Sequence, residues 1–153
     1  MDWDAVAAIG ESVGALAVVV SVIYLAFQVR ENTRTSIQNM VQDTIKDFAR
    51  VDQLIATTPD LASIVVKGNE GIENLAPDQK LRFDGYNSTF FSVLEVWHTQ
   101  SRRIPVDPEQ DDTIRTMLNN RLAERGCQQW WSANQTEFPA GFRNWVEESA
   151  NLN

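Results

Sequence analysis

Histidine, cysteine and positive charge are scarce in this chain of 153 residues. It holds one histidine, His98, and one cysteine, Cys127, and its 21 acidic residues outnumber 13 basic ones, for a formal net charge of −8. A single cysteine excludes an intrachain disulfide framework, and a single histidine excludes a multi-histidine metal cluster within one chain. Because a surface for nucleic acid must be basic and no basic cluster exists beyond Arg102-Arg103, we expect no nucleic-acid partner.

Sequence motifs that carry catalysis are missing as well. The chain contains no GxSxG, no phosphate-binding glycine loop, no dinucleotide-binding fingerprint and no HExxH. Cys127 follows Gly126 at a predicted helix start, but nothing in the sequence places His98 beside it, so we expect a structural thiol. The sequence therefore predicts a non-enzymatic protein, with no catalytic residue, no cofactor and no metal site.

One long apolar run is present near the N-terminus. The 25 residues from Ala5 to Val29 include a single charge, Glu11, and as a helix they are long enough to cross the roughly 30 Å hydrocarbon core of a bilayer. A secretory signal peptide would need a positive N-terminal region and a small-residue cleavage site, but acidic residues precede this run and Arg30 follows it. The core helix of a soluble protein is the other alternative. We predict a transmembrane helix at residues 1–30.

Charges beside the apolar run predict its orientation. Arg30 and Arg34 follow the run directly, whereas the flank before it carries Asp2 and Asp4. Because cytoplasmic flanks carry an excess of Lys and Arg, the C-terminal side is expected in the cytoplasm and the N-terminus outside. Residues 31–153 would then form a cytoplasmic domain held at the lipid bilayer by one helix.

Small and polar residues recur along the predicted span at alternating steps of three and four. On a helix these steps form one narrow stripe, and two of its glycines form a GxxxG pair. Close backbone approach and hydrogen bonds between helices drive association in lipid, so the stripe predicts contact with a second copy or with another membrane protein. The residues of this association stripe are Ala7, Gly10, Gly14, Ala17, Ser21, Tyr24 and Gln28.

Glu11 is the one carboxylate inside the apolar run. Near the outer boundary of the bilayer, an acidic side chain reaches water or headgroups at modest cost and needs no partner. In an oligomer, the same residue would instead place a ring of carboxylates at the mouth of a pore. Both interpretations fit the sequence.

Beyond the membrane run, apolar residues recur at helical spacing and predict an all-α domain. No glycine or proline interrupts Ala15 to Thr58, so the first helix is expected to run unbroken to Thr58, with a bend near Asn32-Thr33 as the alternative. A short helix is expected from Asp60 to Lys67, stopped by Gly68, and a loop from there to Ala76.

Prolines mark the starts of two further helices. Pro77 opens a long helix with Leu81, Tyr86, Phe90, Val93, Leu94 and Trp97 on one face, and Pro108 opens a helix stopped by Gly126. A short helix with Trp130 and Trp131 and a final helix with Phe142, Trp145 and Val146 complete a helical hairpin or bundle. Phe138, Phe142 and Trp145 are expected in its core.

Glu95 and His98 stand three residues apart on a predicted helix, the spacing of one half of a di-iron site in helical bundles. Such a site needs a second pair and further glutamates, which the sequence does not reveal. A helix histidine beside Trp97 that is hydrogen-bonded or exposed is the alternative.

Both ends of the chain carry a distinctive pattern of residues. From Trp3 to Thr33, a tryptophan-led apolar helix with an E-x-x-G step ends in Y-L-x-x-Q-[IV]-R-x-N-T. Near the C-terminus, a pattern of W-W, F-x-x-x-F and a hydrophobic pair is formed by Trp130, Trp131, Phe138, Phe142, Trp145 and Val146. Both patterns resemble those of a widespread family of small uncharacterised bacterial membrane proteins. The resemblance implies an inner-membrane protein and supplies no activity.

Three functions follow as hypotheses. The leading one is a single-pass inner-membrane protein that self-associates, or joins a larger membrane complex as an accessory or scaffold subunit, through the association stripe. The alternative is a homo-oligomeric pore with Glu11 near its mouth. The third is a metal-binding helical protein that uses Glu95 and His98.

Overall fold

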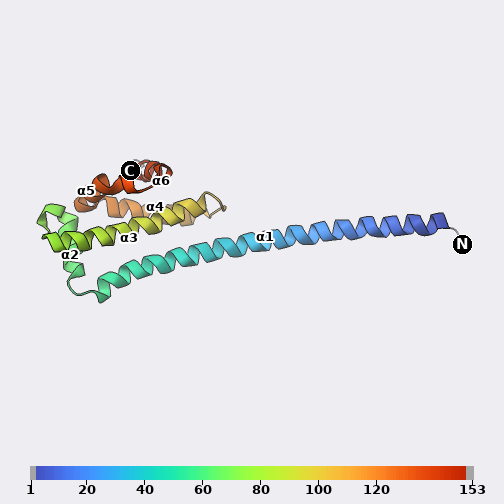
Figure 1. The fold of residues 1–153 in the computed structure, drawn as a ribbon, viewed down its shortest axis with the longest axis horizontal. Coiled ribbons are helices and arrows are strands. Elements are labelled where there is room, and N and C mark those ends of the chain that lie inside the picture. The colour runs from blue at the N-terminus through green and yellow to red at the C-terminus, as the bar shows by residue number, and fades with distance from the viewer. Residues whose placement is uncertain (1–2, 151–153) are drawn as a thin grey trace. The chain divides into compact units, whose positions relative to one another are not determined.

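The fold is known from a computed structural model that describes residues 3–150, with side chains from Gly10 onward. In this range the chain forms six α-helices and no strand, which confirms the all-α prediction (Figure 1). A long apolar helix comes first and a helical domain follows it. The helices are α1 (Trp3–Thr57), α2 (Leu61–Glu70), α3 (Pro77–Ser101), α4 (Pro108–Leu122), α5 (Arg125–Asn134) and α6 (Ala140–Ala150), with 3-10 turns η1 (Ile72–Asn74) and η2 (Gln135–Glu137).

Helix α1 is unbroken over 55 residues, so the predicted single long helix is confirmed. The chain divides within this helix into two compact units, Met1–Asn39 and Met40–Asn153. We call them the N-terminal unit and the helical unit. The last 18 residues of α1, from Met40 to Thr57, belong to the helical unit.

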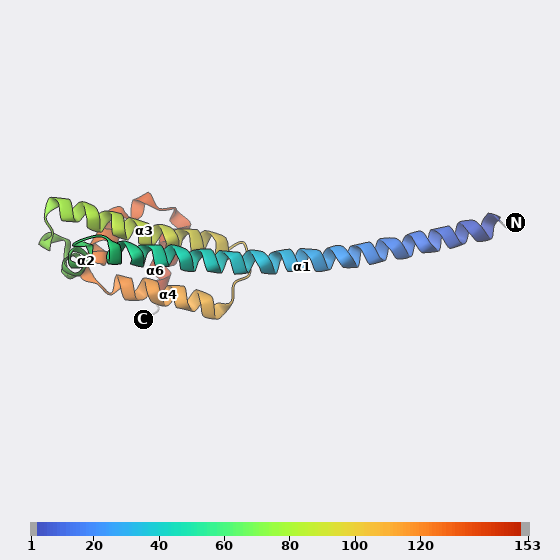
Figure 2. The same cartoon turned by 90° about the horizontal axis from the view of Figure 1, so that it is seen from below.

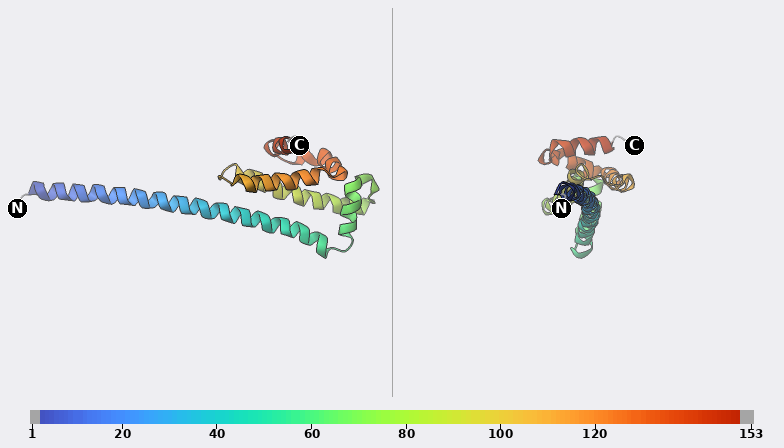
Figure 3. Two further views of the ribbon diagram at one scale, coloured as in Figure 1. Left: turned by 180° about the vertical axis from the view of Figure 1, so that it is seen from behind. Right: turned by 90° about the vertical axis from the view of Figure 1, so that its right-hand side faces the viewer.

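Within the helical unit, the helices stack in three layers. The end of α1 forms one outer layer, α3 and α4 form the middle, and α5 and α6 form the other outer layer (Figures 1 and 3). Helix α2 crosses one end and contacts both α3 and α5, while α6 contacts both α3 and α4. Figure 2 shows α3 and α4 on either side of the α1 segment in projection.

Aromatic side chains fill the space between these layers. Phe91 is completely buried on α3, and its ring stacks on Trp130 and Trp131 of α5 at centroid distances of 5.3 and 4.7 Å. Phe48 brings α1 into the same core through Phe90, at 5.7 Å. The predicted core residues Phe138, Phe142 and Trp145 are all buried, which confirms their assignment.

Pro77 and Pro108 begin two helices, as the sequence predicts. Pro77 occupies the first turn of α3, where its missing N–H costs nothing. Pro108 does the same in α4, and the Asp107 carboxylate caps that helix by accepting a hydrogen bond from the Glu109 N–H at 3.0 Å.

Two glycines that the sequence marks as helix stops lie inside helices. Gly68 is buried within α2, which continues to Glu70, and Gly126 is buried in the first turn of α5. A Cβ on Gly126 would lie 1.6 Å from the Gly68 carbonyl oxygen, and a Cβ on Gly68 would lie 2.5 Å from the Phe83 ring. The prediction of stops was wrong because these glycines let two helix backbones cross in contact.

The prediction of the apolar face of α3 was wrong for one residue. Leu81 is 73% exposed, whereas Phe83 and Asn87, which the pattern omitted, are buried to 1% and 0% exposure. The buried face therefore starts at Phe83 and includes a polar side chain. Phe90, Leu94 and Trp97 are buried as expected.

Arg121 of α4 holds that buried polar side chain. Its guanidinium donates to Asn87 Oδ1 of α3 and to Asn69 Oδ1 of α2, both at 2.8 Å, and lies 4.8 Å from the centroid of the Tyr86 ring. Asn87 in turn donates to the Phe83 carbonyl at 2.9 Å. One arginine thus connects three helices of the helical unit.

Candidate functional site

The apolar surface of α1 is the first candidate site. Eleven large side chains between Val13 and Val29 are 51–67% exposed. Among the described residues, one helix is long and apolar enough to cross a membrane, and none of that stretch is buried. A core helix of a soluble protein would be mostly buried, so the exposure of these side chains favours a cover from outside the chain.

The association stripe lies on this helix. Gly10, Gly14, Ala17, Ser21, Tyr24 and Gln28 are all exposed, and no atom lies within 4 Å of a Cβ placed on either glycine. The Ser21 hydroxyl already donates to the Ala17 carbonyl at 2.8 Å, which leaves Tyr24 and Gln28 as the donors of the stripe that no described bond uses. Ala7 lies outside the residues whose side chains are described.

Glu11 is exposed one residue after Gly10. On a helix with 3.6 residues per turn, adjacent residues point about 100° apart, so Glu11 lies beside the association stripe and not on it. Its predicted place near the membrane boundary, and the pore interpretation, stay predictions.

Glu95 and His98 share α3, and the structure gives them no third partner. No group of three or more His, Cys, Asp or Glu side chains lies close enough to hold a metal ion within the described residues. His98 is 9% exposed and packs against Phe142 and Trp145 of α6, with ring centroids 5.9 and 5.3 Å away. The expected histidine was hydrogen-bonded or exposed, whereas His98 is buried and its Nε2 has no hydrogen-bond partner among the described residues. That part of the prediction was wrong because the rings of α6 cover His98.

Charge and burial both act on His98. Burial lowers the pKa of its imidazole, the Arg102 and Arg115 guanidinium groups lower the pKa further, and the carboxylates of Asp111 and Glu148 oppose this. The net direction is below the usual value of 6.5. The ring is therefore neutral at pH 7 and carries one N–H donor.

This lowered pKa predicts a pH dependence of stability. Because the unfolded chain takes up a proton on His98 more readily than the folded chain, the free energy of unfolding should fall as pH drops through about 6.5. His98 is the only histidine, so it dominates between pH 7.5 and 5.5. Urea unfolding of the wild type should show this loss, and His98→Gln should show a smaller one. Equal losses in both proteins would assign the effect to carboxylates.

Cys127 is completely buried in α5. Burial is the main cause that raises the pKa of its thiol, to about 11, with Arg121 lowering it and Glu124 raising it. A buried thiol that stays protonated is a poor nucleophile, so the expectation of a structural role is supported.

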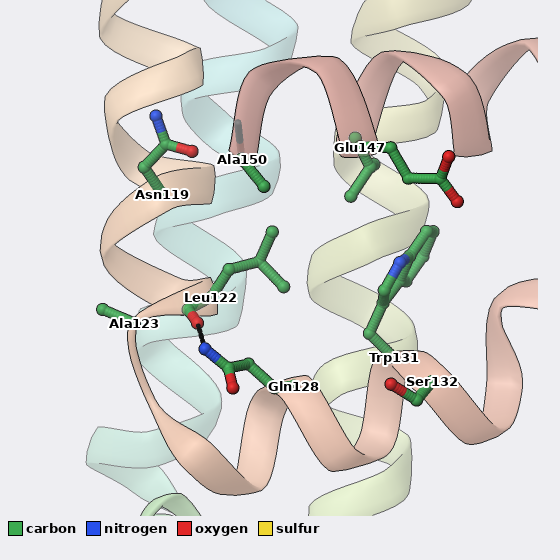
Figure 4. A pocket seen from close by; sticks show the side chains of 9 residues that line it. Asn119, Leu122, Ala123, Gln128, Trp131, Ser132, Glu147 and Ala150 are labelled. Carbon is green, nitrogen blue, oxygen red and sulfur yellow. Dashed lines mark hydrogen bonds between the residues drawn. The ribbon is translucent and has the colours of Figure 1, made fainter. Parts of the chain in front are cut away.

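A pocket of about 530 Å³ lies between α4, α5 and α6 of the helical unit (Figure 4). Asn119 and Leu122 come from α4, Gln128 and Trp131 from α5, and Glu147 from α6. The Gln128 amide donates to the Leu122 carbonyl at 2.6 Å. Glu147 is the one ionisable side chain that lines it, so the pocket holds no acid and base pair.

A second pocket, of about 430 Å³, lies at the end of α3. Its lining includes His98, Arg102 and Arg103 from α3 and the residues after it. Gly141 and Phe142 line it from the start of α6. From the sequence, Arg102-Arg103 stands out only as the one basic cluster, because the start of α6 lies almost 40 residues further along the chain. No local signal predicts that contact.

In comparisons with protein-family models, with curated proteins and with solved structures, the chain has no match. The resemblance of its two ends to small bacterial membrane proteins therefore stays a prediction.

Proposed function

We propose that this chain is a non-enzymatic, single-pass inner-membrane protein whose copies associate through the association stripe of α1. The supporting observation is the stretch of exposed apolar side chains on one unbroken helix, with small residues along one of its sides. Leaving this surface in water would cost free energy in proportion to its apolar area. A bilayer covers the lipid-facing side chains, and a second copy packs against the small ones.

The glycines are central to this association. At Gly10 and Gly14 the backbone itself forms the surface, because no side chain of the described residues covers either position. A partner helix can then approach closely enough for dispersion contacts along the backbone, and Tyr24 and Gln28 remain to donate hydrogen bonds across the interface.

Substitution of both glycines tests the stripe. The double variant Gly10→Leu, Gly14→Leu should weaken association in liposomes about tenfold or more, because two large side chains separate the helices. Energy transfer between donor- and acceptor-tagged copies, measured over a dilution series in lipid, reports the change.

The matched control adds the same bulk on the other side of the helix. Ala15 and Ala26 lie about 140° and 160° from Gly10 around an ideal helix, so Ala15→Leu, Ala26→Leu should leave association within about twofold. If neither double variant lowers the energy transfer below that of the wild type, the stripe is removed from the proposal. If both variants lower it equally, bulk anywhere on α1 disturbs association.

The proposed orientation places the N-terminus outside and the helical unit in the cytoplasm, because Arg30 and Arg34 follow the apolar run. A C-terminal green fluorescent protein should then fluoresce, and a C-terminal alkaline phosphatase should be inactive. Exchange of the flanking charges should invert the helix, so that fluorescence falls and phosphatase activity rises. The variant combines Asp2→Arg, Asp4→Arg, Arg30→Asp and Arg34→Asp. An active phosphatase on the wild type would contradict the orientation.

A further inference from the structure

The spacing of the association stripe continues along α1 into the helical unit. Helix α1 is unbroken as far as Thr57, and beyond Gln28 the same alternating steps of three and four lead first to Glu31 and then only to uncharged residues. Thr35 and Gln38 come before the helical unit begins. Within that unit the spacing reaches three residues that we call the outer face of α1, namely Gln42, Ile45 and Ala49.

The outer face is exposed although it carries a large apolar side chain. All three of its residues are exposed, and 62% of the surface of Ile45 is accessible. The core of the helical unit instead takes Met40, Phe48 and Val51, which lie on average about 140° away around an ideal helix. Because the end of α1 is an outer layer of this unit, none of the other helices covers the outer face (Figures 1 and 3).

The charges of this segment lie on another side of α1. Lys46 pairs with Asp43 at 2.9 Å, and Arg50 pairs with Asp47. These charges are therefore matched within one copy and need no partner from outside. The outer face itself meets no charge until Asp52, the next position in the same spacing.

An uncharged face of this kind fits a second copy of the chain. Along two parallel helices in a symmetric contact, each residue meets its own counterpart, so a charged residue would face an equal charge. Glutamine can both donate to and accept from its counterpart, and no described bond uses the Gln42 amide. Two Ile45 side chains would bury apolar surface against each other. A foreign partner of a chain with net charge −8 would gain from basic residues opposite carboxylates, and this face offers none.

We propose that the interface between two neighbouring copies extends from the association stripe onto the outer face of α1, as a short parallel coiled coil that ends before Asp52. This inference rests on the proposed function, because contact along the stripe brings the two α1 helices side by side. A repeat of about 3.5 residues keeps the same face of two helices in contact through a left-handed supercoil. At Asp52 two carboxylates would meet, and the contact stops there.

Single cysteines on two sides of α1 test the extension in the full chain, in the liposomes of the energy-transfer experiment. With copper phenanthroline as oxidant, Ile45→Cys should form a disulfide between copies, because counterparts in a parallel pair lie close enough for one. Gln42→Cys and Ala49→Cys should cross-link as well. The wild type gives the background, since its Cys127 is completely buried.

Arg50→Cys is the matched control. The Arg50 side chain is 73% exposed, so a cysteine there is as accessible to the oxidant as one at Ile45, but it points about 140° away. Its cross-linking yield should be lower than that of Ile45→Cys by about fivefold or more. Both substitutions change an exposed side chain, so neither is expected to disturb the core.

Energy transfer between tagged copies in the same liposomes separates this inference from the proposed function. Transfer together with cross-links at Ile45 and not at Arg50 would support the extension. Transfer with cross-links at neither position, or equally at both, would overturn the extension and leave association through the stripe in place. An absence of transfer in the wild type would overturn the proposed function, and the extension with it.

Discussion

Gly126→Ala should destabilise the helical unit by about 3 kcal/mol or more, at the upper end of the cost of overpacking. The added Cβ would lie 1.6 Å from the Gly68 carbonyl oxygen and 2.7 Å from its carbon, so the backbones of α2 and α5 must move apart. A backbone group cannot rotate away as a side chain can. The separation also loosens the contacts of Trp130 and Trp131, which lie on the same short helix.

Gly85→Ala is the matched control. It introduces the same methyl group in α3, where nothing lies within 4 Å, and should stabilise the protein by about 0.5–1 kcal/mol through helix propensity. Urea unfolding followed by tryptophan fluorescence measures both changes, and labelling of Cys127, buried in the folded protein, reports unfolding independently. A Gly126→Ala midpoint no lower than that of Gly85→Ala would contradict the backbone contact.

Arg121→Ala should cost about 2–4 kcal/mol, because it removes two hydrogen bonds from a charged donor and leaves Asn87 Oδ1 buried without a partner. Arg121→Lys should recover only part of this, since a point charge cannot hold Asn87 and Asn69 in the planar geometry of a guanidinium. The same urea unfolding experiment measures these losses.

Arg125→Ala serves as the control for Arg121. Arg125 pairs with Glu73 at 2.6 Å, but the two side chains are 64% and 49% exposed. Exposed ion pairs contribute about 0–1 kcal/mol, so a small loss is expected. If Arg121→Ala costs no more than Arg125→Ala, Arg121 does not connect the three helices in the way described.

The helices themselves could be predicted from local patterns. The unbroken α1 follows from the absence of glycine and proline between Ala15 and Thr58, and the starts of α3 and α4 follow from Pro77 and Pro108. These signals act over one or two helical turns. The helix predictions are correct because the helix propensity of each segment agrees with its place in the fold.

The predictions that were wrong concern residues whose partners lie far along the chain. Gly68 and Gly126 were predicted to end helices. A sequence does not distinguish a glycine that ends a helix from a glycine that lets another backbone cross in contact. The two residues lie 58 positions apart. Asn87 was omitted from the buried face of α3 because its burial requires Arg121, 34 positions away.

The candidate sites divide in the same way. The association stripe is a periodic pattern within one helix, so the sequence contains all of it. The pocket at the end of α3 also needs the start of α6, and only the fold brings His98 and Arg102 to Gly141. His98 and Arg102 lie four residues apart in the sequence, but no local pattern joins them to Gly141.

The association of copies through α1 is tested most directly by the mass and composition of the particle in its own membrane. Extraction of the full chain with an amphipathic polymer that retains the surrounding lipid, followed by native mass spectrometry, gives both. We predict a particle that contains several copies of this chain in a fixed number and no other protein. A single copy, or a constant complex with a foreign subunit and only one copy of this chain, would contradict self-association.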